Sequence, residues 1–209
     1  MDEIKNKIKL LAKKYREELH LKFIDRVRDM KTDDNSHYLI YKVLGISVHE
    51  GEKIDIYQNK GRFLYKYAGS FLEEATILCF ESKFPNAQKK VMIENTEGKK
   101  PKKFEIDCLI ENYAYEIKWR DATTDGDHIT KEHTRIITIK NAGFIPVRIM
   151  FFFPNRDQAI RIQKTLQTLY LGIEGEYYFG DTAWKYIKEK TNIDLFAILE
   201  EMAEEVENE

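Results

Sequence analysis

The sequence has few cysteines, prolines and glycines, and no long apolar run. Its 209 residues include 2 Cys, 4 Pro and 10 Gly. The two cysteines, Cys79 and Cys108, lack CxxC spacing, which disfavours a zinc site or a disulfide framework and favours buried thiols. A membrane-spanning helix needs about 20 consecutive apolar residues, and the charged amino end does not have the shape of a signal peptide. We therefore expect a cytoplasmic protein with no membrane contact.

The chain also has little net charge. A formal charge of -2, from 34 basic and 36 acidic residues, argues against indiscriminate binding of nucleic acid but leaves room for a local basic cleft. The hydrophobic content of 43% and charged content of 33% are typical of a soluble globular protein. We expect one domain over 1–209, with an N-terminal helical and irregular region at 1–64, a core at 65–170 and a C-terminal helical extension at 171–209.

Hydrophobic periodicity predicts an α/β chain of mixed α+β type. Within the core the order is helix, three strands, helix, strand, helix. Helices are predicted at 2–30, 65–84, 128–141, 155–170, 183–190 and 193–206, and strands at 89–95, 104–110, 113–119 and 145–153. The segment 38–57 is consistent with short strands or an irregular connection. The nearly continuous apolar strand at 145–153 is typical of a central position, so a mixed sheet flanked by helices is expected.

Three charged side chains interrupt the apolar, β-prone segment 104–120: Asp107, Glu116 and Lys118. A hairpin with a two-residue turn at 111–112 places Asp107 opposite Glu116 and Glu105 opposite Lys118. Directly paired residues share a face, so these four groups are predicted to lie together. The opposite face then carries eight other residues: Phe104, Ile106, Cys108, Ile110, Tyr113, Tyr115, Ile117 and Trp119.

Two carboxylates about 5 Å apart repel one another unless a cation lies between them. Mg²⁺ prefers oxygen ligands, and when bound it lowers the pKa of an attacking water and stabilises charge on a phosphate. Lys118 is placed to orient that water or to stabilise the phosphorus centre. The pattern predicts phosphodiester hydrolysis with Mg²⁺ as cofactor and Asp107, Glu116 and Lys118 as catalytic residues. The alternative is a solvated hairpin face with Glu105 and Lys118 as a surface ion pair.

A further acid is expected from the helix at 65–84. At about 100° per residue, Glu74 lies on the flank of its apolar stripe and Glu73 points nearly away from it. Glu74 is therefore the better candidate to lean over the sheet and join Asp107 and Glu116 as a metal ligand. The alternative is an ordinary boundary carboxylate.

This layout, with an Asp on the second strand and Glu-x-Lys on the third, resembles the core of the PD-(D/E)xK nucleases over 65–170. The resemblance implies metal binding by Asp107 and Glu116, water activation by Lys118, and Glu74 as the helix acid near the metal. The sequence departs from the motif at its proline, where it has Ile106.

Three blocks further resemble the ApaLI-type type II restriction endonucleases over about 107–199: EIKWRDATTDGDHITKEH, IPVRIMFFFPNRDQAIRIQ and EGEYYFGDTAW. The resemblance implies a restriction-endonuclease-like fold and a homodimer that cuts a short palindromic site in double-stranded DNA. A cognate methyltransferase is expected in the same system, though not as a binding partner. The alternatives are a DNA repair or junction-resolving nuclease and a non-catalytic DNA-binding or assembly protein.

A restriction enzyme reads base edges close to its metal, and the polar loop at 121–127 follows the catalytic strand directly. Candidate recognition residues are Thr123, Thr124, Asp125, Asp127, His128 and Lys131, with Arg120 and Arg135 as phosphate contacts. The loop residues Asp127 or Thr124 are alternatively helix caps. Arg148, Arg156 and Tyr177 are further candidates for base contacts. No cysteine or third histidine accompanies His128 and His133, which disfavours zinc.

Overall fold

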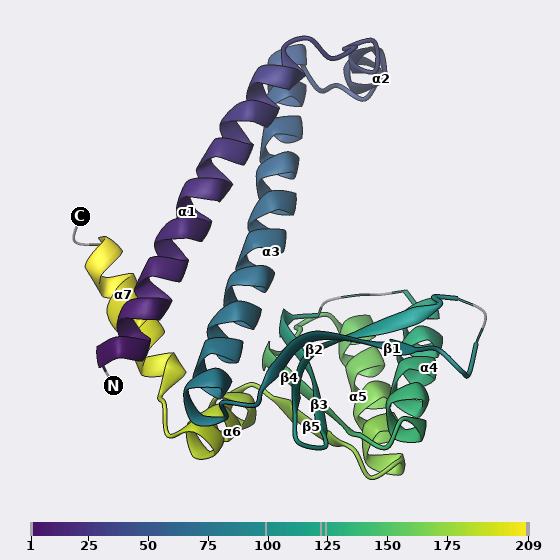
Figure 1. Cartoon of the computed structure of the whole chain (residues 1–209). Helices are drawn as coiled ribbons and strands as arrows, with labels where there is room; N and C mark the ends of the chain where they lie inside the picture. The colour runs from purple at the N-terminus through teal and green to yellow at the C-terminus, as the bar shows by residue number, and fades with distance from the viewer. Residues whose placement is uncertain (1, 99, 122, 124, 208–209) are drawn as a thin grey trace. The chain divides into compact units, whose positions relative to one another are not determined.

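The computed structural model describes residues 2–98, 100–121, 123 and 125–207 of the chain (Figure 1). No helix in these ranges is both long and apolar enough to cross a membrane. The chain divides into two compact units, one made of residues 1–8 with 72–209 and the other of residues 9–71. Two long helices, α1 (Asp2–Met30) and α3 (Val48–Lys83), run through both units.

The smaller unit is helical throughout its regular structure, so the expectation of strands or an irregular connection at 38–57 was wrong. The segment forms α2 (Tyr38–Val43), a turn at Gly45 with a φ of 81°, and the first turns of α3. Its valines, isoleucines and tyrosines favour strands only weakly, and tertiary packing overrides such propensity. The Tyr41 hydroxyl donates to Asp55 of α3 at 3.0 Å, and a side chain at Gly51 would clash with the Tyr41 ring.

The larger unit contains a five-stranded mixed sheet in the order β1-β2-β3-β4-β5. The strands are β1 (Gln88–Glu94), β2 (Lys103–Ile110), β3 (Tyr113–Arg120), β4 (Ile145–Phe152) and β5 (Glu176–Phe179). Strands β1 to β3 are antiparallel, whereas β4 and β5 run parallel to β3. The core order of helix, three strands, helix and strand is confirmed. The short β5 was not predicted as a strand.

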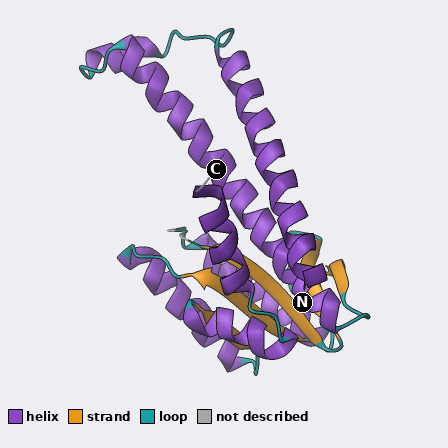
Figure 2. Ribbon diagram, turned by 90° about the vertical axis from the view of Figure 1, so that its left-hand side faces the viewer, coloured by secondary structure: helices purple, strands orange, loops and turns teal. Residues whose placement is uncertain are grey.

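Helices cover both faces of this sheet (Figures 1 and 2). On one face, α4 (Asp127–Asn141) and α5 (Asp157–Gly172) enclose an apolar cluster with Met150 of β4. On the other, the Tyr115 ring of β3 contacts Phe80 at the end of α3 and Tyr186 of α6 (Asp181–Thr191). The last helix is α7 (Leu195–Glu207). Gly143, with a φ of 87°, follows α4 where a helix stop was expected.

The predicted hairpin register is confirmed next to the turn, where Cys108 pairs with Tyr115 and Ile110 with Tyr113, but the paired residues do not extend to the predicted pairs of Asp107 with Glu116 and Glu105 with Lys118. The expected apolar face is only partly correct. Ile106 was assigned to the side of Cys108 and Tyr115, but it packs with Leu109 and with Ile139 of α4, on the other side of the sheet. Strict alternation is therefore broken between residues 106 and 109.

The break in alternation lies beside a distortion of the neighbouring strand. Lys90 in β1 has a φ of 51°, and the ladder of β1 with β2 pairs Lys89 with Cys108 and Val91 with Ile106 on either side of it. A local irregularity of this kind re-aims a side chain. Here the side chain is that of Asp107, whose Oδ2 accepts the backbone N–H of Ile117 at 2.7 Å.

Candidate active site

Asp107, Glu116 and Lys118 come together where β2 and β3 lie side by side. The side chains of Asp107 and Glu116 are only 6% and 4% exposed. Lys118 Nζ lies 2.6 Å from Glu116 Oε1, and the Lys118 side chain keeps 34% of its surface accessible. Because both carboxylates are buried, they do not form the solvated hairpin face that was the alternative interpretation. One lysine and two carboxylates thus lie together on the neighbouring strands β2 and β3.

The two carboxylates have opposite protonation preferences. Burial and the neighbouring Glu116 raise the pKa of Asp107 to about 7. Burial also acts to raise the pKa of Glu116, but the charges of Lys118 and Arg135 outweigh it and lower the pKa to about 2. The pKa of Lys118 is raised, because Glu116 and Asp107 outweigh a burial effect that acts to lower it. Lys118 is therefore held in its charged form beside Glu116.

An acid of α3 whose pKa responds to this neighbourhood is Glu73, whereas the helical stripe favoured Glu74, which stays a prediction. Glu73, Ile77 and Phe80 are spaced by four and three residues and share one helix face. Phe80 packs on Tyr115 with ring centroids 4.6 Å apart, so this face lies against the sheet. Burial raises the pKa of Glu73, with Lys118 acting to lower it and Glu116 to raise it. The end of α3 buries more than one face, including Ile77, so a single apolar stripe does not decide between Glu73 and Glu74.

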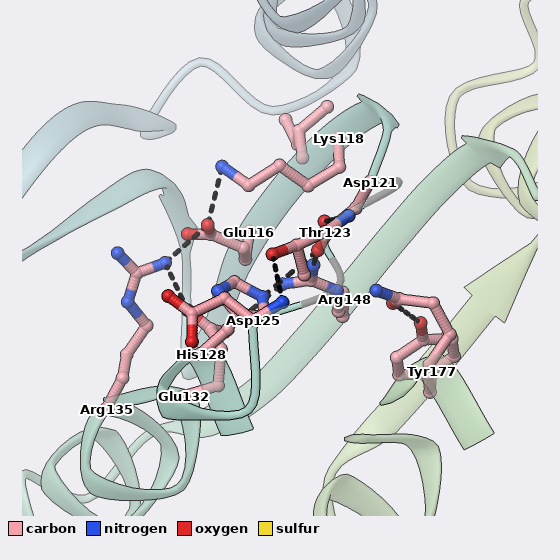
Figure 3. A network of polar contacts seen from close by, with 12 residues as sticks. Glu116, Lys118, Asp121, Thr123, Asp125, His128, Glu132, Arg135, Arg148 and Tyr177 are labelled. Carbon is pink, nitrogen blue, oxygen red and sulfur yellow. Dashed lines mark hydrogen bonds and ion pairs between the residues drawn. The ribbon is translucent and has the colours of Figure 1, made fainter. Parts of the chain in front are cut away.

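Two arginines, one on α4 and one on β4, link Glu116 to Glu132 and Asp121 (Figure 3). Arg135 Nη1 pairs with Glu116 Oε1 and lies 3.4 Å from Glu132 Oε1. Arg148, which is fully buried in β4, donates to Glu132 Oε2 at 3.1 Å and to Asp121 Oδ2 at 2.6 Å. These five residues form one continuous network of charges.

The predicted recognition loop begins at Asp121 and is held by its own polar side chains. The N–H of Thr123 donates to Asp121 Oδ1 at 3.2 Å, and that of Asp127 donates to Asp125 Oδ1 at 3.0 Å. His128 Nε2 lies 3.1 Å from Asp121 Oδ2. Thr124 lies outside the described residues. Asp125 and Asp127 are exposed, whereas Thr123 and His128 are half-buried.

The basic candidates divide into inward and outward groups. Lys131 is exposed and, with Lys100 and Asp127, lines a hollow of about 520 Å³. Arg120 is half-buried and donates to Asn155 Oδ1 at 3.3 Å. Arg135, expected at a phosphate, instead has its guanidinium engaged by Glu116 and Glu132.

Two of the further base-contact candidates are corrected by the structure. Arg148 is fully buried between Glu132 and Asp121, and the buried Tyr177 hydroxyl donates to Gln163 at 2.6 Å. Neither reaches a ligand from inside the protein. Arg156, just before α5, is exposed.

The donor set is compatible with a hard divalent cation. No cluster of three or more His, Cys, Asp and Glu side chains fit to hold a metal occurs in the described parts of the chain. Mg²⁺ needs only one or two carboxylates, however, because it keeps several waters. Burial raises the pKa of Asp107 most and the neighbouring Glu116 raises it further, and a cation would relieve the repulsion between these two carboxylates. Asp107 and Glu116 therefore fit a Mg²⁺ ion.

Comparison with known proteins identifies the family. A model of the ApaLI-like restriction endonuclease family matches residues 1–204. The chain belongs to the ApaLI-like restriction endonuclease family. No curated protein and no solved structure matches it. Membership makes the chain a type II restriction endonuclease, a hydrolase whose substrate is DNA, and the mixed sheet flanked by helices is consistent with a restriction-endonuclease-like fold.

In this ApaLI-like restriction endonuclease, four residues near the expected centre were missed or misread in the sequence: Glu73, Asp121, Glu132 and Arg148. The sequence did contain a signal for Arg148, which is the one charged residue in the apolar strand 145–152. A charged side chain buried in such a strand is expected to have an oppositely charged partner. The signal for Glu132 was weaker: it is a carboxylate that occupies one of the buried positions of α4. Asp121 sits in the loop already singled out, but its inward direction follows only from the fold.

Proposed function

We propose that the chain is a PD-(D/E)xK-type endonuclease that cuts a short palindromic DNA site with Mg²⁺. The observation that carries the proposal is the buried pair Asp107 and Glu116, with Lys118 Nζ 2.6 Å from Glu116. Asp107 and Glu116 are the proposed metal ligands, and Glu73 takes the place that the sequence gave to Glu74. Held there, Mg²⁺ would lower the pKa of an attacking water and stabilise charge on the phosphate.

The chain's own residues hold and polarise the reacting groups. The N–H of Ile117 fixes one oxygen of Asp107, so that this carboxylate keeps one orientation. Lys118 is charged and partly accessible, which suits it to orient a water and to stabilise negative charge that grows on the phosphate. Arg135 pairs with the same Glu116 oxygen, Oε1, and so also fixes this carboxylate.

Recognition is proposed at the loop 121–127 and the first turn of α4, where Asp125, Asp127 and Lys131 are exposed. Carboxylates accept hydrogen bonds from cytosine amino groups, and a lysine donates to guanine or to a phosphate. Arg120 and Arg156 remain proposed contacts to phosphate or base. A palindromic site has two-fold symmetry, so we propose a homodimer in which each copy cuts one strand.

The proposal is tested by incubating the purified chain with a long duplex DNA, with Mg²⁺ or with EDTA. Discrete fragments with Mg²⁺ alone, whose mapped ends share one symmetric sequence, are expected. Cleavage only at branched or damaged DNA would instead indicate a repair or junction-resolving nuclease. Equal cutting in EDTA would contradict the metal-dependent mechanism.

A further inference from the structure

Arg148 is the one charged residue in β4, and its side chain is fully buried. Its neighbours in the strand, Val147 and Ile149, are buried as completely. Burying an ion costs several kcal/mol even after relaxation, and apolar side chains of similar volume are often as stable as a buried ion pair. Fold stability alone therefore gives no reason for an arginine at this position.

The contacts of Arg148 connect the loop 121–127 to the catalytic carboxylate. One end of its guanidinium donates to Asp121 at 2.6 Å, and the other donates to Glu132 at 3.1 Å. Glu132 in turn lies 3.4 Å from Arg135, which pairs with Glu116. Figure 3 shows these side chains in one unbroken series. A shift of Asp121 thus acts on Glu116 through four successive ion pairs.

At the other end of this series, Asp121 anchors the loop. Its Oδ1 accepts the N–H of Thr123 at 3.2 Å, and the Thr123 hydroxyl accepts the N–H of Asp125 at 3.3 Å. The N–H of Asp127 then donates to the Asp125 carboxylate at 3.0 Å. Each contact spans two residues, so a ligand that reorients Asp125 disturbs the geometry at Asp121.

We propose that Glu132 and Arg148 are positioning residues that couple DNA contact at the loop 121–127 to the orientation of Glu116. The inference rests on the proposed function and deepens it. DNA that fits the loop aligns Asp121, and the relay then holds Glu116 in its reactive orientation. DNA that binds without fitting the loop leaves Glu116 less well aligned. Selectivity for the site is thereby expressed in the cleavage rate as well as in binding.

Glu132→Gln tests the relay, because it removes the charge and keeps the size of the side chain. Two duplexes are used, one carrying the site mapped from wild-type cleavage and one with a single base pair of that site changed. We expect the single-turnover rate on the mapped site to fall at least 30-fold while the Kd stays within threefold. The ratio of rates between the two duplexes is expected to fall about tenfold. Glu174→Gln, the same change on the Lys140 pair, is the control.

A second variant guards against loss of folding. Glu132→Leu combined with Arg148→Met removes both charges, so no buried arginine is left without a partner, and Asp121 retains His128. This double variant is expected to melt as a folded protein and to show the same separation of binding from cleavage. Wild-type rate and selectivity in either folded variant would overturn the relay, as would a loss of affinity equal to the loss of rate. A wild-type chain that cuts no DNA would defeat the proposed function instead.

Discussion

The carboxylate of Asp107 accepts the backbone N–H of Ile117 at 2.7 Å, which ties the second strand of the sheet to the third at the proposed catalytic centre. The bond explains how a carboxylate that is 6% exposed keeps one direction although the alternation of its strand is broken there. It also places Asp107 close enough to Glu116 for the Glu116 carboxylate to raise the pKa of Asp107, in addition to the effect of burial. Stability and catalysis therefore make opposing demands on Asp107.

The first prediction separates these demands with Asp107→Asn. The folded-state pKa of about 7 lies above the unfolded value, so the folded protein binds more protons and the carboxylate costs stability as pH rises from about 4 to 7. The variant is expected to melt about 5 °C above wild type at pH 8, where a gain of about 2 kcal/mol applies, and to lose this advantage near pH 4. Cleavage is expected to be abolished. Thermal melts across pH, paired with cleavage of a long duplex, provide the measurement. A lower melting temperature at pH 8 would contradict the buried-carboxylate argument.

The second prediction concerns Lys118. Lys118→Met removes the cation next to Glu116 and is expected to lower the single-turnover cleavage rate about 10²–10³-fold, the range found when one charge-stabilising group is removed. DNA affinity should change little, because the lysine is inside the centre. Lys140→Met, on the exposed pair with Glu174, is the matched control and should cut normally. A Lys118→Met protein as fast as this control would remove Lys118 from the mechanism.

The third prediction places DNA at the first turns of α4. Lys131→Ala is expected to weaken duplex binding and to reduce the slope of log K against log salt by about one, as the loss of one phosphate contact does. Lys185→Ala on α6 is the comparison, since Lys185 is equally exposed but lies on the opposite side of the sheet. The measurement is a titration of labelled duplex at several salt concentrations. Equal slopes for the two variants would show that the DNA does not contact the hollow lined by Lys131.

The fourth prediction tests the close approach of backbones before β5. A Cβ on Gly175 would lie 2.7 Å from the carbonyl oxygen of Pro146 and 2.9 Å from that of Tyr170. Gly175→Ala is expected to destabilise the fold by about 1–3 kcal/mol, as overpacking does. Gly172→Ala, where nothing lies within 4 Å of the added atom, is expected to be neutral or stabilising by about 0.4–1 kcal/mol. Denaturant unfolding of both variants measures the difference.

Sequence patterns predicted the parts of the fold that depend on long periodic segments. The strands at 104–110 and 113–119 and the register of their paired ends follow from alternation and turn length, whereas the direction of Asp107 also depends on the local distortion beside it. The break in side-chain alternation near Lys90 and Asp107 depends on contacts among three strands. The sequence of a single strand therefore does not predict it. The helical 38–57 segment was missed because packing of Tyr41 against the start of α3 outweighs its β propensity. The pairing of Arg148 with Asp121 likewise joins residues far apart in the sequence.

The last prediction decides between two acids of α3: Glu74, which helical periodicity favoured, and Glu73, which we propose from the structure. Glu73 shares a helix face with Phe80, which packs on the sheet, and its pKa responds to Lys118 and Glu116. Glu73→Gln is therefore expected to raise the Mg²⁺ concentration needed for half-maximal cleavage about tenfold, whereas Glu74→Gln should leave it near the wild-type value. The two variants differ by one position, so charge, size and helix propensity are matched. A Mg²⁺ titration of the cleavage rate distinguishes them. If Glu74→Gln shifts the titration and Glu73→Gln does not, the face of α3 assigned from the contact of Phe80 with Tyr115 does not carry the catalytic acid.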